Sequence, residues 1–276
     1  MEIPNEVAVQ RYNMVRDEVR TRCPGIWNLV VQLCSTVPDR IDTGHVWQFG
    51  RDKPCWSNIT VAIGERIASD LSRSEDFNSY QVIASDAWEI VMLNRGTEWR
   101  KNENFELRGK SVRDFVHRLP KGGLSSYLWR LYAIRNLALA LTRDTIVQEM
   151  VSNLSAQGGI QSTELRKWTK AFCNHVGMGW GVVTVYHMLA DIGLTPKPDI
   201  WLNRSVIKMG LLSLQYPPNS TEEQIDKADV HAVVIAALEL AELIVPTAFP
   251  EKPQSSIREV DKVLMEWGRQ RLARPL

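Results

Sequence analysis

Residues 164–210 combine small and charged types at a spacing that suits binding of an anionic group. Val176 is followed by Gly177, Met178 and Gly179, between two stretches with the apolar periodicity of helices. Two glycines around one residue permit a tight hairpin whose backbone N–H groups point outward, where they can bind a phosphate. Such contacts position a nucleic acid without reading its sequence.

An acidic residue, Asp199, opens the next predicted helix, over residues 200–209. Pro198 favours an extended conformation for the residue before it, so a helix begins naturally just beyond this proline. Aspartate at such a place is typical of an N-cap, which stabilises a helix by about 1 kcal/mol. Asp199 can therefore serve the helix alone or take part in chemistry, and the spacing leaves both open.

The order of helix, G-x-G hairpin, helix, proline-containing loop and aspartate resembles the helix-hairpin-helix (HhH-GPD) DNA glycosylase superfamily. The likeness spans residues 82–245 and is strongest over 177–210, which ends in KPDIWLNRSVIKMG. It implies an all-α, two-lobed fold with the DNA- and base-binding cleft between the lobes, and it makes Asp199 the catalytic carboxylate. It also implies that double-stranded DNA is contacted by Val176, Gly177, Met178, Gly179, Gly181 and Lys197.

Upstream, the likeness is carried by residues 89–97 and 134–140. In the family the first segment corresponds to a helix that ends in a polar loop probing the DNA, and the second to a later helix containing Arg or Lys. The loop here lacks the Gln-Gln or Gln-Asn pair common in the family. Asn94 and Arg95 are the candidates for the residue that wedges into the duplex, with capping of a helix as the alternative.

The activity that this resemblance implies is excision of a modified or damaged base by hydrolysis of its N-glycosidic bond. Cleavage builds positive charge on the deoxyribose, which an ionised Asp199 would stabilise while it orients or deprotonates a water molecule. A helix N-terminus favours the ionised form. Family members that also cut the strand carry a lysine two residues after the second hairpin glycine. Gly181 stands there, which implies a monofunctional enzyme that leaves an abasic site.

The target base must leave the duplex, so we expect an aromatic pocket for it. The chain has ten tryptophans, most of which belong to the core. Stacking surfaces can come from Trp47, Trp56, Trp88, Trp99 and Trp129. The candidates for contact with the base are Trp88, Tyr127, Trp129 and Tyr132.

Neither a metal nor a cofactor is expected, although the resemblance allows a monovalent cation held by hairpin carbonyls. His175 and His187 flank the hairpin, and we expect them to pack or to contact phosphate, because the sequence offers no set of metal ligands. The four cysteines are widely scattered and are expected to be reduced thiols.

Apolar residues recur at helical spacing in most long segments, including 82–93 and 222–243, and strand alternation is nowhere sustained. This pattern predicts an all-α fold. We expect an N-terminal helical region over 1–80 that forms part of a cover lobe, a glycosylase core over 81–245 with its hairpin within 164–193, and a C-terminal helix within 246–276 that packs on the core.

The formal net charge of +1 argues against a broadly basic surface. Residues 118–143 nevertheless hold five basic side chains and no acidic one, which predicts either a strip facing phosphates or a solvated helix face. No apolar run is long enough to span a membrane, and the N-terminus does not resemble a signal peptide. We therefore expect a cytoplasmic monomer without membrane contact.

Two other hypotheses stay open. Helix-hairpin-helix elements also serve as phosphate grips in proteins that cleave nothing, so the chain can be a non-catalytic DNA-binding module. It can also be a helical interaction scaffold without a nucleic-acid partner. Asp199 favours the enzyme, because a grip needs no acid after its hairpin. The identity of the base is open, and both base-excision repair and restriction of phage DNA with hypermodified bases are compatible with the pattern.

Overall fold

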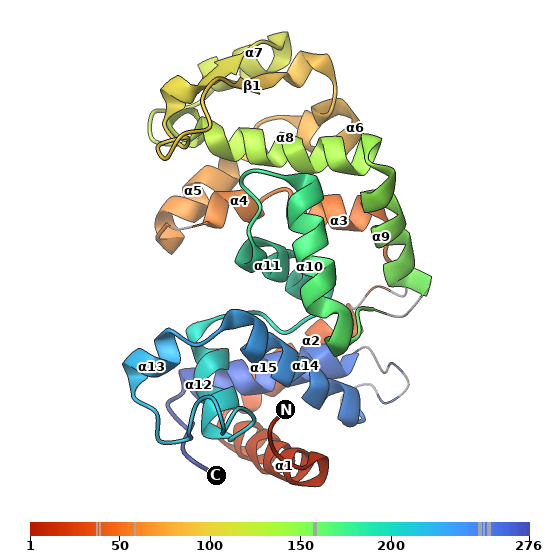
Figure 1. Ribbon diagram of the computed structural model, residues 1–276, viewed down its shortest axis with the longest axis vertical. Coiled ribbons are helices and arrows are strands. Elements are labelled where there is room, and N and C mark those ends of the chain that lie inside the picture. The colour runs from red at the N-terminus through yellow and green to blue at the C-terminus, as the bar shows by residue number, and fades with distance from the viewer. Residues whose placement is uncertain are drawn as a thin grey trace. The chain divides into compact units, whose positions relative to one another are not determined.

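The computed structural model describes residues 1–36, 38, 40–57, 59–156, 159–247, 250, 252 and 255–276. These residues are mostly helical, as the all-α prediction required (Figure 1). The chain divides into two compact units. We call Met1–Asp39, Gln157–Lys167 and Leu189–Leu276 the terminal unit, and Arg40–Ala156 with Trp168–Met188 the central unit.

The terminal unit is built around helix α15 (Ser255–Arg269), which packs against four other helices. These are α1 (Asn5–Arg22), α2 (Pro24–Ser35), α12 (Ile200–Lys208) and α14 (Val230–Leu243), with the short α13 (Glu222–Asp226) beside α12. Trp267 and Leu264 of α15 are fully buried in the apolar core that these helices share. Burial of this apolar surface is the main force that holds the unit together.

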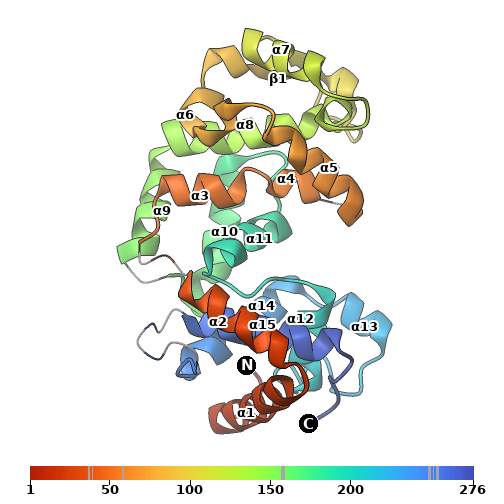
Figure 2. The same ribbon diagram turned by 180° about the vertical axis from the view of Figure 1, so that it is seen from behind.

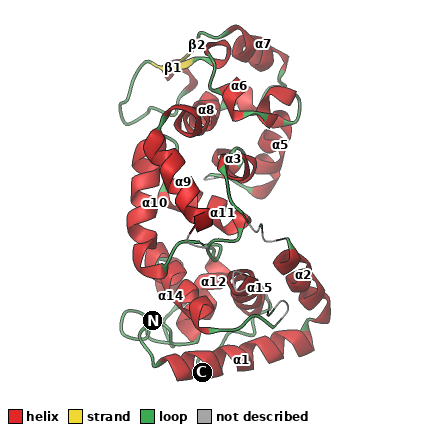
Figure 3. Ribbon diagram, turned by 90° about the vertical axis from the view of Figure 1, so that its right-hand side faces the viewer, coloured by secondary structure: helices red, strands yellow, loops and turns green. Residues whose placement is uncertain are grey.

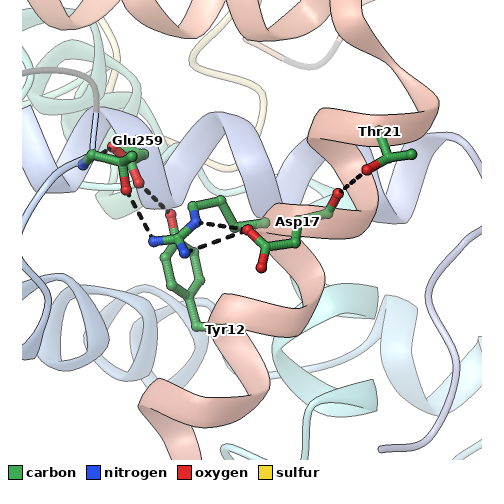
Figure 4. Close-up of polar contacts among 6 residues, drawn as sticks. Tyr12, Asp17, Thr21 and Glu259 are labelled. Atoms are coloured by element: carbon green, nitrogen blue, oxygen red, sulfur yellow. Dashed lines mark hydrogen bonds and ion pairs between the residues drawn. The ribbon is translucent and has the colours of Figure 1, made fainter.

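Buried polar groups also join α1 to α15. Figure 4 shows the Tyr12 hydroxyl directed at the Glu259 carboxylate, to which it donates a hydrogen bond of 3.3 Å. The backbone N–H of Thr247 donates to the same carboxylate at 2.6 Å. Burial, with the negative charge of Glu259, raises the pKa of Tyr12 well above its ordinary value. A buried carboxylate that is bonded in this way is satisfied rather than reactive.

The central unit surrounds helix α8 (Leu128–Arg143). This helix packs against α3 (Thr43–Gly50), α4 (Lys53–Trp56), α6 (Tyr80–Ile83) and α9 (Thr145–Ala156) (Figures 1 and 2). The unit also contains α5 (Val61–Leu71), α7 (Lys110–Arg118) and the 3-10 helices η1 (Glu75–Asn78), η2 (Asp86–Trp88), η3 (Asn102–Asn104) and η4 (Leu124–Ser126). The unit boundaries at 167/168 and 188/189 fall inside α10 (Ser162–Val176) and α11 (Val182–Ile192).

The prediction of one helix over residues 82–93 is wrong. Helix α6 ends at Ile83, η2 follows, and the chain then forms strand β1 (Ile90–Met92), which pairs antiparallel with β2 (Phe105–Leu107) (Figure 3). Ile90 lies opposite Leu107 and Met92 opposite Phe105. Ile90 and Val91 are β-branched and suit a strand, and pairing with Phe105–Leu107 overrides the local helical period.

Two further differences concern helix boundaries. The predicted helix over 222–243 is divided, because Asp229 accepts hydrogen bonds from the backbone N–H groups of His231 and Ala232 and begins α14 as its N-cap. Helices α3 and α4 lie in a segment for which no helix was predicted. The expected division at residues 80 and 245 stays a prediction, and residues 248, 249, 251, 253 and 254 of its last part lie outside the described residues.

The basic stretch over 118–143 is not exposed along its whole length. Neither prediction for it, a strip facing phosphates or a solvated helix face, therefore holds for the whole stretch. Arg130 and Arg135 of α8 are only 2% and 9% exposed. The Arg130 guanidinium donates hydrogen bonds to the carbonyls of Pro54 and Ser57. This arginine joins α8 to the segment around α4 and is not available to DNA.

No helix in the described part of the chain is both long and apolar enough to cross a membrane. The four cysteines are free thiols, and Cys34 and Cys55 are buried.

Candidate functional site

The hairpin between α10 and α11 has the tight backbone that its glycines predict. Gly177 and Gly179 have φ values of +89° and +94°, in the left-handed region that favours glycine. The Gly177 N–H donates to the Cys173 carbonyl at 2.9 Å, and the Trp180 N–H donates to the Gly177 carbonyl at 3.2 Å. The chain therefore reverses over four residues, directly after Val176.

Contacts with α8 hold this hairpin in place. A Cβ atom at Gly179 would lie 2.3 Å from that of Ala133, so only glycine fits there. The Trp180 indole N–H donates to the Ala133 carbonyl at 2.8 Å, and the Asn136 side-chain amide donates to the Met178 carbonyl at 3.1 Å. The hairpin is thus fixed before any ligand arrives, which limits the entropy lost on binding.

Three backbone N–H groups in and next to the hairpin have no acceptor within the described part of the chain. They are those of Met178, Gly179 and Gly181. Gly181 is exposed, and a Cβ atom there would meet nothing within 4 Å. These donors stand beside the N-terminus of α11, whose helix dipole also favours an anion. The carbonyls of Gly177 and Met178 already accept hydrogen bonds, and the monovalent cation stays a prediction.

Asp199, in the terminal unit, is the N-cap of α12. Its carboxylate accepts a 2.7 Å hydrogen bond from the Leu202 backbone N–H. Burial raises the pKa of Asp199, and the negative charge of Asp261 raises it further, against the lowering effect of the Leu202 hydrogen bond. The helix N-terminus does favour ionisation, as expected, but burial outweighs it.

Asp261 of α15 stabilises the segment that leads to Asp199. Its side chain is 1% exposed and accepts a hydrogen bond of 2.7 Å from the Lys197 backbone N–H. The Lys262 ammonium lies 3.1 Å from its other oxygen. Lys197 itself is half-buried. Asp261 was not among the site residues expected from the sequence. The pattern that could have indicated it is an acidic residue between the apolar Val260 and Val263 of a helix.

A pocket of about 570 Å³ opens beside the hairpin, within the central unit. Its walls combine tryptophans, basic side chains and the first turn of α11. The lining residues are Lys53, Trp56, Ser57, Trp99, Arg100, Gly179, Trp180, Gly181, Val182, Val183, Thr184 and His187. We call this space the hairpin pocket. Trp56 and Trp99 are the two predicted stacking surfaces that it brings together.

The four candidates for base contact do not line the hairpin pocket. Trp88 is 2% exposed and donates to the Asp76 carboxylate at 2.9 Å, so it is a core residue. Trp129 is also buried, with the Arg130 guanidinium 4.3 Å from its ring centre. Tyr127 lies against the same guanidinium, and Tyr132 packs on Phe105. Both tyrosines are half-buried.

Asn94 and Arg95 lie on an exposed loop that follows strand β1. The Asn94 side-chain oxygen accepts a 2.9 Å hydrogen bond from the Gly96 N–H and so stabilises a turn. The alternative that these residues cap a helix is wrong, because a strand precedes them. Leu93, which sequence analysis missed, is 59% exposed on the same loop. The pattern that could have indicated Leu93 is a large apolar residue next to a polar turn.

The histidines near the hairpin have different surroundings. The His175 Nδ1 lies 2.8 Å from the Asp144 carboxylate, whereas His187 lines the hairpin pocket. Within the part of the chain that the structure describes, no three His, Cys, Asp or Glu side chains are grouped so that they can hold a metal ion.

Comparison with protein-family models, with curated proteins and with solved structures finds no match to this chain.

Proposed function

We propose that this protein is a monofunctional DNA glycosylase of the helix-hairpin-helix type. The observation that carries the proposal is the position of Asp199, which is half-buried beside a second carboxylate. A helix needs only an exposed N-cap, such as Asp42, whose pKa is lowered by the hydrogen bond from the His45 backbone N–H. Asp199 has the opposite shift. A carboxylate kept in an environment that opposes its charge is typical of functional sites.

The raised pKa suits the chemistry of base release. An ionised carboxylate that is partly withdrawn from water stabilises the positive charge on the sugar more strongly than a solvated one. A carboxylate that holds its proton more tightly is also the better general base toward water. Asp261 acts through the backbone at Lys197, so it positions Asp199 and does not touch the substrate.

The hairpin supports DNA as the substrate. Fixed backbone donors at a helix N-terminus suit a phosphate group, and this contact is independent of base sequence. The exposed loop of Leu93, Asn94 and Arg95 offers an apolar and a basic side chain together. An apolar side chain inserted into a duplex unstacks a base step, which is required before a base can be flipped out.

The proposal that the enzyme is monofunctional rests on Gly181. This residue has no amine, so it cannot form a Schiff base with the sugar. Water is then the nucleophile, and the strand is left intact at an abasic site. Borohydride added during turnover should therefore give no covalent protein–DNA adduct. An adduct that disappears when Lys170 or Lys197 is replaced would show that the enzyme uses an amine.

The test of the activity is a panel of duplexes that carry alkylated, oxidised or phage-type hypermodified bases, treated with alkali to reveal abasic sites. We expect strand breaks with the wild-type chain and nearly none with Asp199→Asn, which keeps the N-cap acceptor and loses the charge. Asp229→Asn changes an exposed N-cap of the same unit and is the matched control. It should keep full activity.

The alternative is a non-catalytic DNA-binding module, for which the hairpin alone suffices. That hypothesis predicts retention of DNA without breaks on any member of the panel. Turnover by Asp199→Asn equal to that of the wild-type chain would contradict the catalytic role of this residue. A scaffold without a nucleic-acid partner would retain no DNA even at low salt, where phosphate contacts are strongest.

A further inference from the structure

We propose that the hairpin pocket binds one unstacked nucleotide of a DNA strand, with the base against Trp99 and Trp56 and the phosphate at the start of α11. That the strand is DNA rests on the proposed function. The volume of the hairpin pocket, about 570 Å³, lies within the range of about 300–1,000 Å³ that is usual for small-molecule sites.

The aromatic wall is rigid. The Trp56 indole N–H donates to the Asp52 carboxylate at 3.1 Å, and a Cβ atom at Gly64 would lie 2.5 Å from the Trp56 ring, so helix α5 backs this ring closely. Trp99 meets Trp129 edge to face, with ring centres 5.7 Å apart. Trp56 and Trp99 are both half-buried. Fixed rings that remain accessible are suited to stacking on a base.

The charge of the pocket is positive. The Arg100 guanidinium lies 5.2 Å from the centre of the Trp99 ring and 5.1 Å from that of Trp129. No carboxylate of the described residues pairs with Arg100. Lys53 also lines the pocket, 3.0 Å from Asp52, and no acidic side chain is part of the lining. An anionic ligand is therefore favoured.

The first turn of α11 supplies donors for the anion. Its opening residues, Val182, Val183 and Thr184, line the pocket together with Gly181. The turn contains no acidic residue, and its backbone N–H groups have no acceptor among the described residues. Helix N-terminal donors bind phosphate.

The two walls together identify the ligand class. Inorganic phosphate would use the donors and Arg100 but not the tryptophans, and a neutral aromatic molecule would use the tryptophans but not the charge. A nucleotide uses both. Because the hairpin N–H groups are continuous with the pocket, a strand whose phosphate lies at the hairpin can place its next nucleotide there.

The test compares two fluorescein-labelled single strands of ten nucleotides, one of thymidines and one built from base-free sugars, by fluorescence anisotropy. The wild-type chain should bind the thymidine strand about tenfold more tightly, as stacking of one base on an aromatic ring predicts. Trp99→Leu should sharply reduce that difference, because it removes one of the two stacking surfaces. Arg100→Ala should weaken binding of both strands.

Two valines provide a matched pair of variants. Val183 and Val61 each stand in the first turn of an 11-residue helix of the central unit, and they are 48% and 67% exposed. Val183→Glu places a negative charge in the pocket and should weaken binding of both strands about tenfold or more. Val61→Glu adds the same charge outside the pocket and should leave binding unchanged.

Equal affinity of the wild-type chain for the two strands, or absence of binding to either, would overturn the proposal. So would a base preference that is undiminished in Trp99→Leu when the circular dichroism spectrum of this variant is unchanged. If bases are released from the duplex panel but the thymidine strand is not preferred, the proposal for the pocket is rejected and that for the glycosylase stands. If the thymidine strand is preferred but no base is released, the glycosylase is rejected and the pocket stands.

Discussion

The carboxyl groups of Asp199 and Asp261 are electrostatically coupled: burial, reinforced by the negative charge of Asp261, raises the pKa of Asp199. Asp261 also accepts the hydrogen bond of 2.7 Å from the Lys197 backbone N–H, two residues before Asp199. One buried side chain, that of Asp261, therefore both positions the proposed catalytic carboxylate and opposes its ionisation.

Asp199→Asn should make the protein more stable at pH 7. Because the pKa of Asp199 is raised in the folded chain, the folded state binds this proton more tightly than the unfolded state does. Ionisation of Asp199 thus lowers the free energy of unfolding at pH values above its folded pKa and has no effect below the ordinary value of 3.8. Urea unfolding should show a gap between variant and wild type at pH 7 that narrows as the pH falls toward 4.

Asp42→Asn is the control, for which we expect the opposite change in the free energy of unfolding. The hydrogen bond from the His45 backbone N–H lowers the pKa of Asp42, so its ionised form stabilises the folded chain. The substitution should reduce the free energy of unfolding at pH 7, and the difference should vanish as the pH falls through the folded pKa, below 3.8. The same direction of change for both variants at pH 7 would contradict the assigned environment of Asp199.

Asp261→Asn should lower the pKa of Asp199, because it removes a nearby negative charge and keeps an oxygen for the Lys197 N–H. Carboxyl carbon NMR of labelled aspartate can follow the titration of Asp199 directly, whatever the protein's activity. Asp226→Asn, on α13, serves as the control. A pKa of Asp199 that is unchanged in Asp261→Asn would show that the two carboxyl groups are not coupled.

The three hairpin glycines should differ in their tolerance of alanine. Gly179→Ala combines positive φ with a clash against Ala133 and should cost about 2–5 kcal/mol of stability. Gly177→Ala has positive φ and open space, which predicts a cost of about 1–2 kcal/mol. Gly181→Ala meets no atom and should change stability by less than about 0.5 kcal/mol. Chemical denaturation measures all three.

The same series has a binding readout. Distortion of the hairpin at Gly177 or Gly179 should weaken binding to all DNA sequences about equally, because the hairpin contacts phosphates and not bases. A loss that is confined to duplexes with one type of base would contradict this role.

Arg130→Ala should destabilise the central unit by about 2–5 kcal/mol, because it leaves the carbonyls of Pro54 and Ser57 without their donor in a buried position. Arg118→Ala, on the exposed end of α7, is the control and should change stability by less than about 0.5 kcal/mol. Thermal unfolding of the two variants makes the comparison. Equal stability of Arg130→Ala and the wild type would contradict the role of this side chain in joining α8 to the segment around α4.

The sequence by itself determined the local features of this protein. Helical periodicity identified most of the long helices, the glycines at 177 and 179 predicted the reversal between α10 and α11, and Pro198 with Asp199 predicted the start of α12. Each of these depends on backbone sterics and hydrogen bonds within about four residues, which are visible in a short stretch of sequence.

Only the tertiary structure decided which side chains meet. Asp261 lies 64 positions from Lys197 in the chain, and three distant segments bring Trp56, Trp99 and the first turn of α11 to one pocket. The strand at Ile90 likewise depends on pairing with Phe105–Leu107, which lies beyond its own stretch of sequence. Burial and Coulomb energy depend on every group that surrounds a charge. The sequence showed an aspartate at 199 and an arginine at 130, and only folding determined that the first is half-buried and the second buried.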